Sequence, residues 1–200
     1  MKEFEEKLLI PSFSSSGVLP PFITEDPSEP NSMSPYQVGL VEFVTHFGTT
    51  PERKLLLRGL LNYRLKMKNV GFTDGIQWID GSFVENIEKI QGRPPADVDL
   101  VTFSAIPTSI TCENEWDLFF DENRSLFDNT LSKKEFYCDA FYVNIHTNPL
   151  YLIQQVRYWF GLFTHQRSTS LWKGIIELNL AEDESDALKL VTEEEINNAS

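Results

Sequence analysis

The chain has 200 residues, 41% hydrophobic and 12% aromatic, which excludes a globally disordered protein because the apolar surface suffices for a packed core. The net charge of −13 argues against a broad nucleic-acid-binding surface, since that affinity comes mainly from Lys and Arg neutralising phosphates. No apolar run approaches the roughly 20 residues that span a bilayer, no signal peptide is recognisable, and two cysteines occur, so we expect a soluble cytoplasmic protein with reduced thiols.

The chain divides into three parts by composition. Residues 1–35 are rich in proline and serine, which predicts an extended arm without regular structure, pinned to the domain by the apolar segment 18–22. Residues 36–180 form the predicted domain. Residues 181–200 are acidic and predict a loosely attached helix or tail, either solvated or in contact with a partner.

The domain should begin with two helices. The first covers about residues 36–47, and the second begins at Thr50-Pro51, a cap residue followed by a proline suited to the first helical turn. Leucines at helical spacing give the second helix a broad apolar stripe that continues to about residue 67. Its arginines and lysines form either a solvated face or a patch that contacts phosphate or a partner.

Strands and helices then alternate along the chain. Runs of β-branched and aromatic residues predict strands, and apolar residues every three or four positions predict helices. The predicted strands are 76–79, 97–103, 136–143 and 173–180, and the predicted helices are 83–90, 113–128 and 150–163, the last with an apolar face for the core. This order predicts an α/β (α+β) fold, a mixed β-sheet flanked by helices.

Two aspartates, Asp97 and Asp99, are separated by one residue on a predicted strand. Side chains alternate along a strand, so both carboxylates face the same side, about 6–7 Å apart at their Cα atoms. Two ionised carboxylates this close repel each other unless a cation lies between them. Hard oxygen ligands suit Mg²⁺ or Mn²⁺, and Mg²⁺ usually completes its shell with substrate phosphates.

Gly81, Ser82 and Asp139 offer the other parts of such a site. Gly81-Ser82 follows a predicted strand, where glycine allows close backbone approach and amides at a helix start favour anions. Asp139 is the one charge in an apolar predicted strand, and such a carboxylate is seldom buried without a partner or metal. An edge-strand aspartate facing water is the alternative. Together these residues predict a metal-nucleotide site.

The combination of Gly81-Ser82, Asp97-x-Asp99 and a later Asp139 resembles the signature of the nucleotidyltransferase superfamily, which has the polymerase-beta-like fold. More narrowly, segments 78–84, 95–100 and 173–177 look like a prokaryotic and phage-associated family of minimal nucleotidyltransferase-like proteins. The resemblance covers about residues 40–180. The segment between Ser82 and Asp97 is long for the superfamily, and little chain remains for a base-reading domain, so nucleobase and acceptor stay unassigned.

The resemblance implies transfer of a nucleotidyl group from an NTP, ATP by default, to a hydroxyl of a protein, a small molecule or an RNA end. Asp97, Asp99 and Asp139 would bind Mg²⁺ or Mn²⁺, and Asp139 would also help to activate the hydroxyl. Gly81 and Ser82 would hold the triphosphate. Lys173, and with weaker support Arg93, would offset phosphate charge, although Lys173 also fits an ordinary exposed lysine.

Other classes of protein remain open at this point. A protein on the same fold can bind nucleotide without turnover, or serve as a regulatory, antitoxin-like partner of another protein. Glycosyltransferases also use Asp-x-Asp, but they need a larger Rossmann-like domain and leave the Gly-Ser turn unexplained. The three histidines, at positions 46, 146 and 165, have no zinc-site spacing.

Overall fold

The computed structural model describes residues 10–24, 29, 32–167 and 169–197. Within this range the helices are α1 (Leu40–Phe47), α2 (Pro51–Asn69), α3 (Ile87–Gln91), α4 (Glu113–Glu122), α5 (Asn129–Phe136), α6 (Pro149–Phe163) and α7 (Ser185–Asn197), with short 3-10 turns η2 (Gly81–Val84) and η3 (Arg124–Leu126). The strands are β1 (Tyr36–Val38), β2 (Ile76–Asp80), β3 (Val98–Ser104), β4 (Cys138–Asn144) and β5 (Ile176–Asn179).

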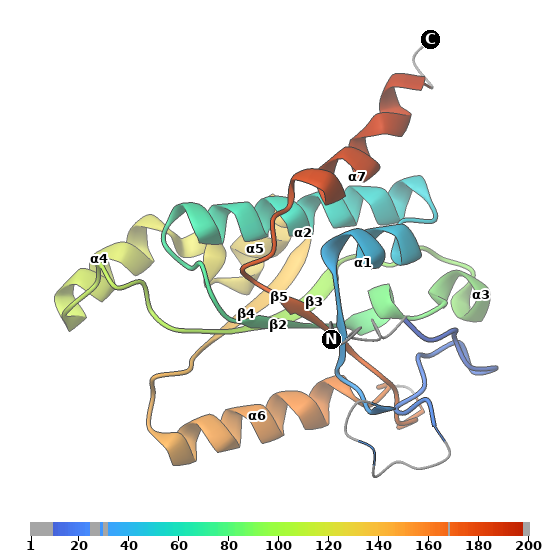
Figure 1. Ribbon diagram of the computed structural model, residues 1–200, viewed down its shortest axis with the longest axis horizontal. Helices are drawn as coiled ribbons and strands as arrows, with labels where there is room; N and C mark the ends of the chain where they lie inside the picture. The colour runs from blue at the N-terminus through green and yellow to red at the C-terminus, as the bar shows by residue number, and fades with distance from the viewer. Residues whose placement is uncertain (1–9, 25–28, 30–31, 168, 198–200) are drawn as a thin grey trace, which may run out of the picture.

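The five strands form one mixed sheet in the order β1-β5-β2-β3-β4. The pairs β1–β5 and β3–β4 are parallel, and β5–β2 and β2–β3 are antiparallel. Helices α1, α2, α5 and α7 lie on one face of the sheet and α6 lies on the other (Figure 1). This mixed sheet between helices confirms the predicted α/β (α+β) class.

The main core lies between the sheet and α2. Thr50 caps α2 by accepting a hydrogen bond from the Arg53 amide, and Pro51 opens the helix, as the sequence predicts. Four leucines of the predicted stripe are buried: Leu56, Leu57, Leu60 and Leu61. Two of the basic residues, Arg53 and Arg64, are buried and paired with Glu88 and Glu184, so at these two positions α2 has no solvated basic face.

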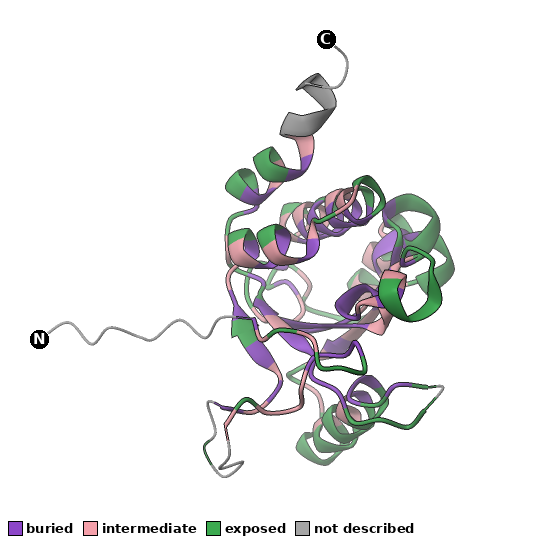
Figure 2. Ribbon diagram, turned by 90° about the vertical axis from the view of Figure 1, so that its right-hand side faces the viewer, coloured by how far each residue is buried: buried purple, intermediate pink, exposed green. Residues whose placement is uncertain are grey.

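Helix α6 is mostly exposed, contrary to the prediction that its apolar face belongs to the core. Trp159 and Phe163 are its buried residues, and they pack against the sheet, while Val156 of the predicted face is exposed. Figure 2 shows α6 as the mainly exposed helix below the sheet. No other helix of the described chain covers this face (Figure 1), so the outer side of α6 meets solvent.

The prediction of a loosely attached C-terminal segment is wrong for residues 184–191. The guanidinium of Arg64 on α2 binds Glu184, with Nε 2.9 Å from Oε1, and both side chains are buried. Ala187 and Val191, four residues apart on α7, are also buried. The acidic composition suggested a solvated segment because the cation that pairs with Glu184 is distant in the sequence.

Three further elements differ from the sequence predictions. The predicted helix 36–47 begins only at Leu40, because residues 36–38 pair with β5, a partner invisible to local patterns. The predicted helix 113–128 ends at Glu122, and a separate helix, α5, follows where none was predicted. Asp128 caps α5 by accepting hydrogen bonds from the amides of Thr130 and Leu131. The third predicted strand, 136–143, therefore begins only at residue 138.

The predicted arm, residues 1–35, lies partly outside the described ranges. Residues 10–24 contain no helix or strand and make isolated bridges at Val18 and Phe22. Val18 and Leu19 are buried, as the predicted pinning segment requires. No described helix combines the length and apolar character needed to cross a membrane. Both thiols are free, with Cys138 buried and Cys112 exposed.

Candidate functional site

Three aspartates form a row across three neighbouring strands. Asp80, the last residue of β2, lies opposite Asp99 of β3, and Asp99 lies beside Asp139 of β4. Neighbouring strands are about 4.8 Å apart, so the row concentrates three carboxylates within about 10 Å. Because Asp97 lies two residues before Asp99, its side chain projects from the same face. The structure thus brings together the three aspartates selected from sequence and adds Asp80.

The acidic row lies on the sheet face that α6 covers. On the same face, the next row along the strands contains Trp78, Val101 and Phe141, all apolar. Helix α6 packs on these apolar rows through Trp159 and Phe163. The last turn of α6 reaches the edge of the acidic row, where Leu162 and Phe163 line a cavity with the aspartates. The apolar rows hold α6 on the sheet, and the acidic row lies at the end of the sheet surface that α6 covers.

Lys133 on α5 is the cation closest to two of these aspartates. Its Nζ lies 2.5 Å from Oδ2 of Asp97 and 3.5 Å from Oδ2 of Asp139. The hydrogen bond to Asp97 and the charges of both aspartates raise the pKa of Lys133. The Lys133 side chain is half exposed, whereas those of Asp97 and Asp139 are mostly covered. Oδ1 of Asp139 is buried and has no hydrogen-bond partner among the described residues.

Gly81 allows the Asp99 carboxylate to lie directly against the backbone. Its φ of +78° is in the left-handed region, and a Cβ at this position would come 1.8 Å from Oδ2 of Asp99. Any other residue would therefore strain the backbone and displace the carboxylate. The segment after Gly81 is a short 3-10 turn followed by α3, instead of the single predicted helix 83–90. The helical segment that begins at Gly81 is thus only this short 3-10 turn.

Gly81→Ala is expected to lower the free energy of unfolding by about 2 kcal/mol or more, because it adds a steric clash to the backbone cost. The matched control is Gly92→Ala, since Gly92 also has a positive φ, +64°, but nothing lies within 4 Å of a Cβ there. The control should cost about 1 kcal/mol. Urea unfolding of both variants measures the difference. Equal losses would mean that the close approach of Asp99 has no energetic role.

Lys173 is buried and is paired with two acids, which corrects both sequence interpretations of this residue. Its Nζ lies 2.8 Å from Oδ1 of Asp80 and 2.7 Å from Oε1 of Glu85. Gln166 donates a hydrogen bond of 2.8 Å to the other oxygen of Glu85. Burial lowers the pKa of Lys173, but Asp80 and Glu85 together raise it above its ordinary value. Lys173 is therefore neither an exposed lysine nor a cation with open access to phosphate.

Burial shifts two carboxylates of the row, those of Asp99 and Asp80, towards neutrality. Burial raises the pKa of Asp99 to about 7, and the charges of Asp97, Asp80 and Asp139 contribute to the rise. Burial raises the pKa of Asp80 to about 6, although its pairing with Lys173 opposes the shift. At neutral pH the row therefore holds more negative charge than its surroundings stabilise, and additional positive charge would be favourable there.

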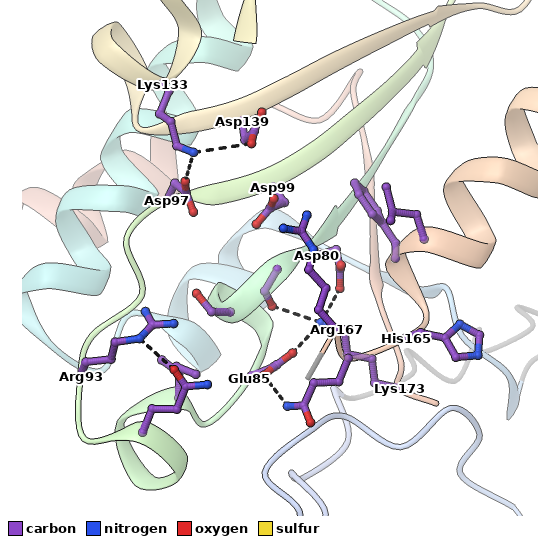
Figure 3. Close-up of a pocket in the computed structure, with 17 residues that line it drawn as sticks. Asp80, Glu85, Arg93, Asp97, Asp99, Lys133, Asp139, His165, Arg167 and Lys173 are labelled. Carbon is purple, nitrogen blue, oxygen red and sulfur yellow. Dashed lines mark hydrogen bonds and ion pairs between the residues drawn. The ribbon is translucent and has the colours of Figure 1, made fainter. Parts of the chain in front are cut away.

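A cavity of about 320 Å³ opens over the carboxylates, and Figure 3 shows its lining. It includes all the residues selected from sequence, from Gly81 and Ser82 to Asp139 and Lys173. Arg93, Arg167 and His165 also line it. Arg167 extends towards Asp99 (Figure 3), and its charge lowers the pKa of that aspartate. The cavity thus combines a carboxylate floor with cationic side chains on its walls.

The donor set fits a hard divalent cation in its chemistry. Carboxylate oxygens from Asp97, Asp99 and Asp139 converge on one face, and the buried Oδ1 of Asp139 lacks a partner among the described residues. No three His, Cys, Asp or Glu side chains of the described chain are spaced to hold an ion as they stand. Lys133 lies between Asp97 and Asp139 instead (Figure 3). Metal binding would require Lys133 to move and the carboxylates to turn.

The sequence interpretation missed four residues of the cavity. Asp80 lies within the segment 78–84, but only its strand register with Asp99 assigns it to the row. Glu85 carried no local signal, because its partner Lys173 is distant in the sequence. Lys133 belongs to the unpredicted helix α5, where the cap residue Asp128 was the available signal. Arg167 lies in a segment without a recognisable pattern.

Comparison with known proteins gives one match. A family described as a family of unknown function, DUF6932, matches residues 11–179. This range includes all five strands and every residue that lines the cavity. No curated protein and no solved structure matches the chain.

Proposed function

We propose that this chain, which belongs to the DUF6932 family, is a metal-dependent nucleotidyltransferase whose active site is the cavity over Asp97, Asp99 and Asp139. The observation that carries the proposal is the convergence of these carboxylates with Asp80 in one row, where burial and repulsion raise the pKa of Asp99 to about 7. Such a concentration of acid is unfavourable for folding, so a functional use of the charge is the reason to keep it.

Asp97, Asp99 and Asp139 would hold Mg²⁺ or Mn²⁺ in this proposal. The bound cation would neutralise phosphate charge and lower the pKa of the acceptor hydroxyl. Gly81 and Ser82 line the same cavity and would contact the triphosphate of the NTP, for which ATP is the default. Arg93 and Arg167 also line it and would offset the negative charge of the phosphates. Lys173 would act indirectly, by holding Asp80 and Glu85 in their buried positions.

In the proposed reaction, the oxygen of an acceptor hydroxyl forms a bond to the α-phosphorus of the NTP. The bond from that phosphorus to the pyrophosphate oxygen breaks, and pyrophosphate leaves. The hydroxyl proton passes to a base, and Asp139 is suited to this role because its Oδ1 has no hydrogen-bond partner in the described structure. The acceptor would be a hydroxyl of a protein, a small molecule or an RNA end.

A thermal-shift titration with ATP, GTP, CTP and UTP, with and without Mg²⁺ or Mn²⁺, tests the proposal. A nucleotide at 100 times its dissociation constant should stabilise the protein by about 2.7 kcal/mol. For a domain of this size the melting temperature should rise by roughly 5–10 °C. The rise should require the metal and should be absent in Asp97→Asn/Asp99→Asn.

The matched control is Asp117→Asn/Glu122→Gln, which removes the same charge from exposed positions on α4. It should keep the full nucleotide-induced rise. The rise within each variant is the quantity to compare, because loss of the Asp99 charge changes the starting melting temperature. If the wild-type protein shows no rise with any nucleotide and metal, the proposal is wrong.

A second candidate function is nucleotide binding without turnover, as in a regulatory or antitoxin-like partner protein. The ion pairs of Lys133 with Asp97 and Asp139 favour it, because a fixed lysine could substitute for a metal ion beside phosphates. The two functions differ in metal dependence. Nucleotide binding that is independent of Mg²⁺ and Mn²⁺, with no pyrophosphate release in an acceptor screen, would favour the second candidate.

A further inference from the structure

Lys133 is held beside the carboxylates by the packing of α5 on β4. Its neighbour Ser132 is buried and donates a hydrogen bond of 2.7 Å to the carbonyl oxygen of Cys138, the first residue of β4. The Ser132 hydroxyl also accepts a hydrogen bond of 3.4 Å from the amide of Ala140. These bonds attach α5 to the two residues that flank Asp139 on β4. The backbone at Lys133 is therefore held in place beside Asp139, while the long Lys133 side chain can reorient.

The ammonium group of Lys133 bridges Asp97 and Asp139, as the dashed lines in Figure 3 show. These two aspartates belong to the set that would hold a metal ion under the proposed function. A cation that uses them must compete with the ammonium group, because both charges require the same oxygens. Lys133 thus occupies part of the cation position in the protein without nucleotide.

A displaced Lys133 would find few free anions in the cavity. Asp80 and Glu85 already pair with the buried Lys173. Asp99 would itself face the incoming metal ion, and it already lies in the field of Arg167. A free metal ion would therefore leave Lys133 unpaired beside a new positive charge, which is unfavourable. A metal-nucleotide complex would bring phosphate oxygens, which can accept hydrogen bonds from the ammonium group.

We propose that Lys133 makes this site select a metal-nucleotide complex over the free metal ion. The ammonium group of Lys133 leaves the carboxylates only when a phosphate replaces them as its partner. This inference rests on the proposed function. Lys133 is then a specificity-determining residue that couples metal and nucleotide binding. By thermodynamic linkage, each ligand raises the affinity for the other by the same factor.

The experiment measures Mn²⁺ binding by the loss of the electron paramagnetic resonance signal of free Mn²⁺. The proteins are the wild type, Lys133→Met and the control Lys134→Met, each with and without a non-hydrolysable ATP analogue. Lys134 is exposed on the same helix and does not line the carboxylate cavity. The readout is binding, so it does not depend on turnover or on knowledge of the acceptor. Urea unfolding of each variant checks that it is folded.

Lys133→Met should bind Mn²⁺ alone at least about tenfold more tightly than the wild type, because one charged hydrogen bond no longer competes. It should bind the Mn²⁺-nucleotide complex more weakly, so the coupling factor between the two ligands should fall by about 100-fold. Lys134→Met should match the wild type. The electrostatic origin can be checked with Lys133→Arg, which keeps the charge and should retain most of the coupling.

The outcomes separate this inference from the proposed function. Metal-dependent nucleotide binding in the wild type, with unchanged Mn²⁺ affinity in Lys133→Met, would overturn the role of Lys133 and leave the proposed function standing. Tighter Mn²⁺ binding by both lysine variants would reveal only a general charge effect and would also overturn it. If no variant binds Mn²⁺ with or without nucleotide, the proposed function fails, and the inference fails with it.

Discussion

Asp99→Asn is expected to stabilise the protein without metal or nucleotide at pH 8 by roughly 2 kcal/mol, and to abolish metal-dependent nucleotide binding. The pKa of Asp99 rises from its ordinary value of 3.8 to about 7, mainly through burial. At ~1.4 kcal/mol per pKa unit this rise corresponds to about 4 kcal/mol, and the partial contact of Asp99 with solvent reduces the expected effect. Asparagine keeps the shape of the side chain and removes its charge.

The stabilisation should depend on pH in a direction that identifies its cause. Between about pH 4 and 7 the folded protein keeps a proton on Asp99 that the unfolded chain releases, so this residue lowers stability as the pH rises. Below pH 4 both the folded and the unfolded state hold the proton, so the variant gains no stability over the wild type. The difference in unfolding free energy between Asp99→Asn and wild type should grow from pH 4 to 7 and then become constant.

Urea unfolding at several pH values measures this difference, and the nucleotide-induced rise in melting temperature measures the loss of function. Asp117→Asn on exposed α4 is the control for removal of one negative charge. The difference in unfolding free energy between variant and wild type is the quantity to compare. Asp80, whose pKa is about 6, titrates in both proteins, so the pH dependence of either protein alone also includes Asp80. A variant that is destabilised at pH 8, or that keeps metal-dependent nucleotide binding, would contradict the role assigned to Asp99.

Lys173→Met is expected to lower the free energy of unfolding by about 3–5 kcal/mol at pH 8. Lys173 is buried between Asp80 and Glu85, so its removal leaves two buried carboxylates without their counter-ion. Lys133→Met should cost less than about 1 kcal/mol, because Lys133 is half exposed and its ion pairs are screened by solvent. The two lysines line one cavity but differ in burial, and the comparison isolates that difference.

The triple variant Asp80→Asn/Glu85→Gln/Lys173→Met tests whether charge is the cause. It removes all three charges at similar volume and should recover most of the stability that Lys173→Met loses. Urea unfolding is again the measurement. If the triple variant is as unstable as Lys173→Met, the loss comes from packing or from the hydrogen bond between Gln166 and Glu85, and the ion-pair explanation is wrong.

The carboxylate site shows which features a sequence can predict. The shared face of Asp97 and Asp99 follows from the alternation of side chains along one strand, a local rule that needs no partner. The lone charge in an apolar predicted strand indicates Asp139 as a site residue, but its position beside Asp99 depends on the parallel pairing of β3 and β4, which no local pattern gives. Glycine at position 81 predicts a close approach to the backbone, and in the structure the carboxylate of Asp99 makes that approach.

The remaining features depend on pairings between distant segments. Lys173 contacts Asp80 and Glu85 only because β5 lies beside β2, and no local pattern gives this neighbour relation. Helix α6 has an apolar face typical of a core helix, yet most of it is exposed because no second helix covers it in the described chain. Periodicity predicts the helix, but the depth of its burial depends on how many elements the fold supplies to that face.

Of the five strands in the described chain, β5 is synthesised last, yet it lies between β1 and β2 in the sheet. A nascent chain can form the β2–β3–β4 part of the sheet, with its acidic row, before residues 176–179 leave the ribosome. Until then, one edge of β2 has no partner, and β1 cannot join the sheet. Open strand edges promote association between chains, so this order of synthesis exposes the growing protein to aggregation until β5 has joined the sheet.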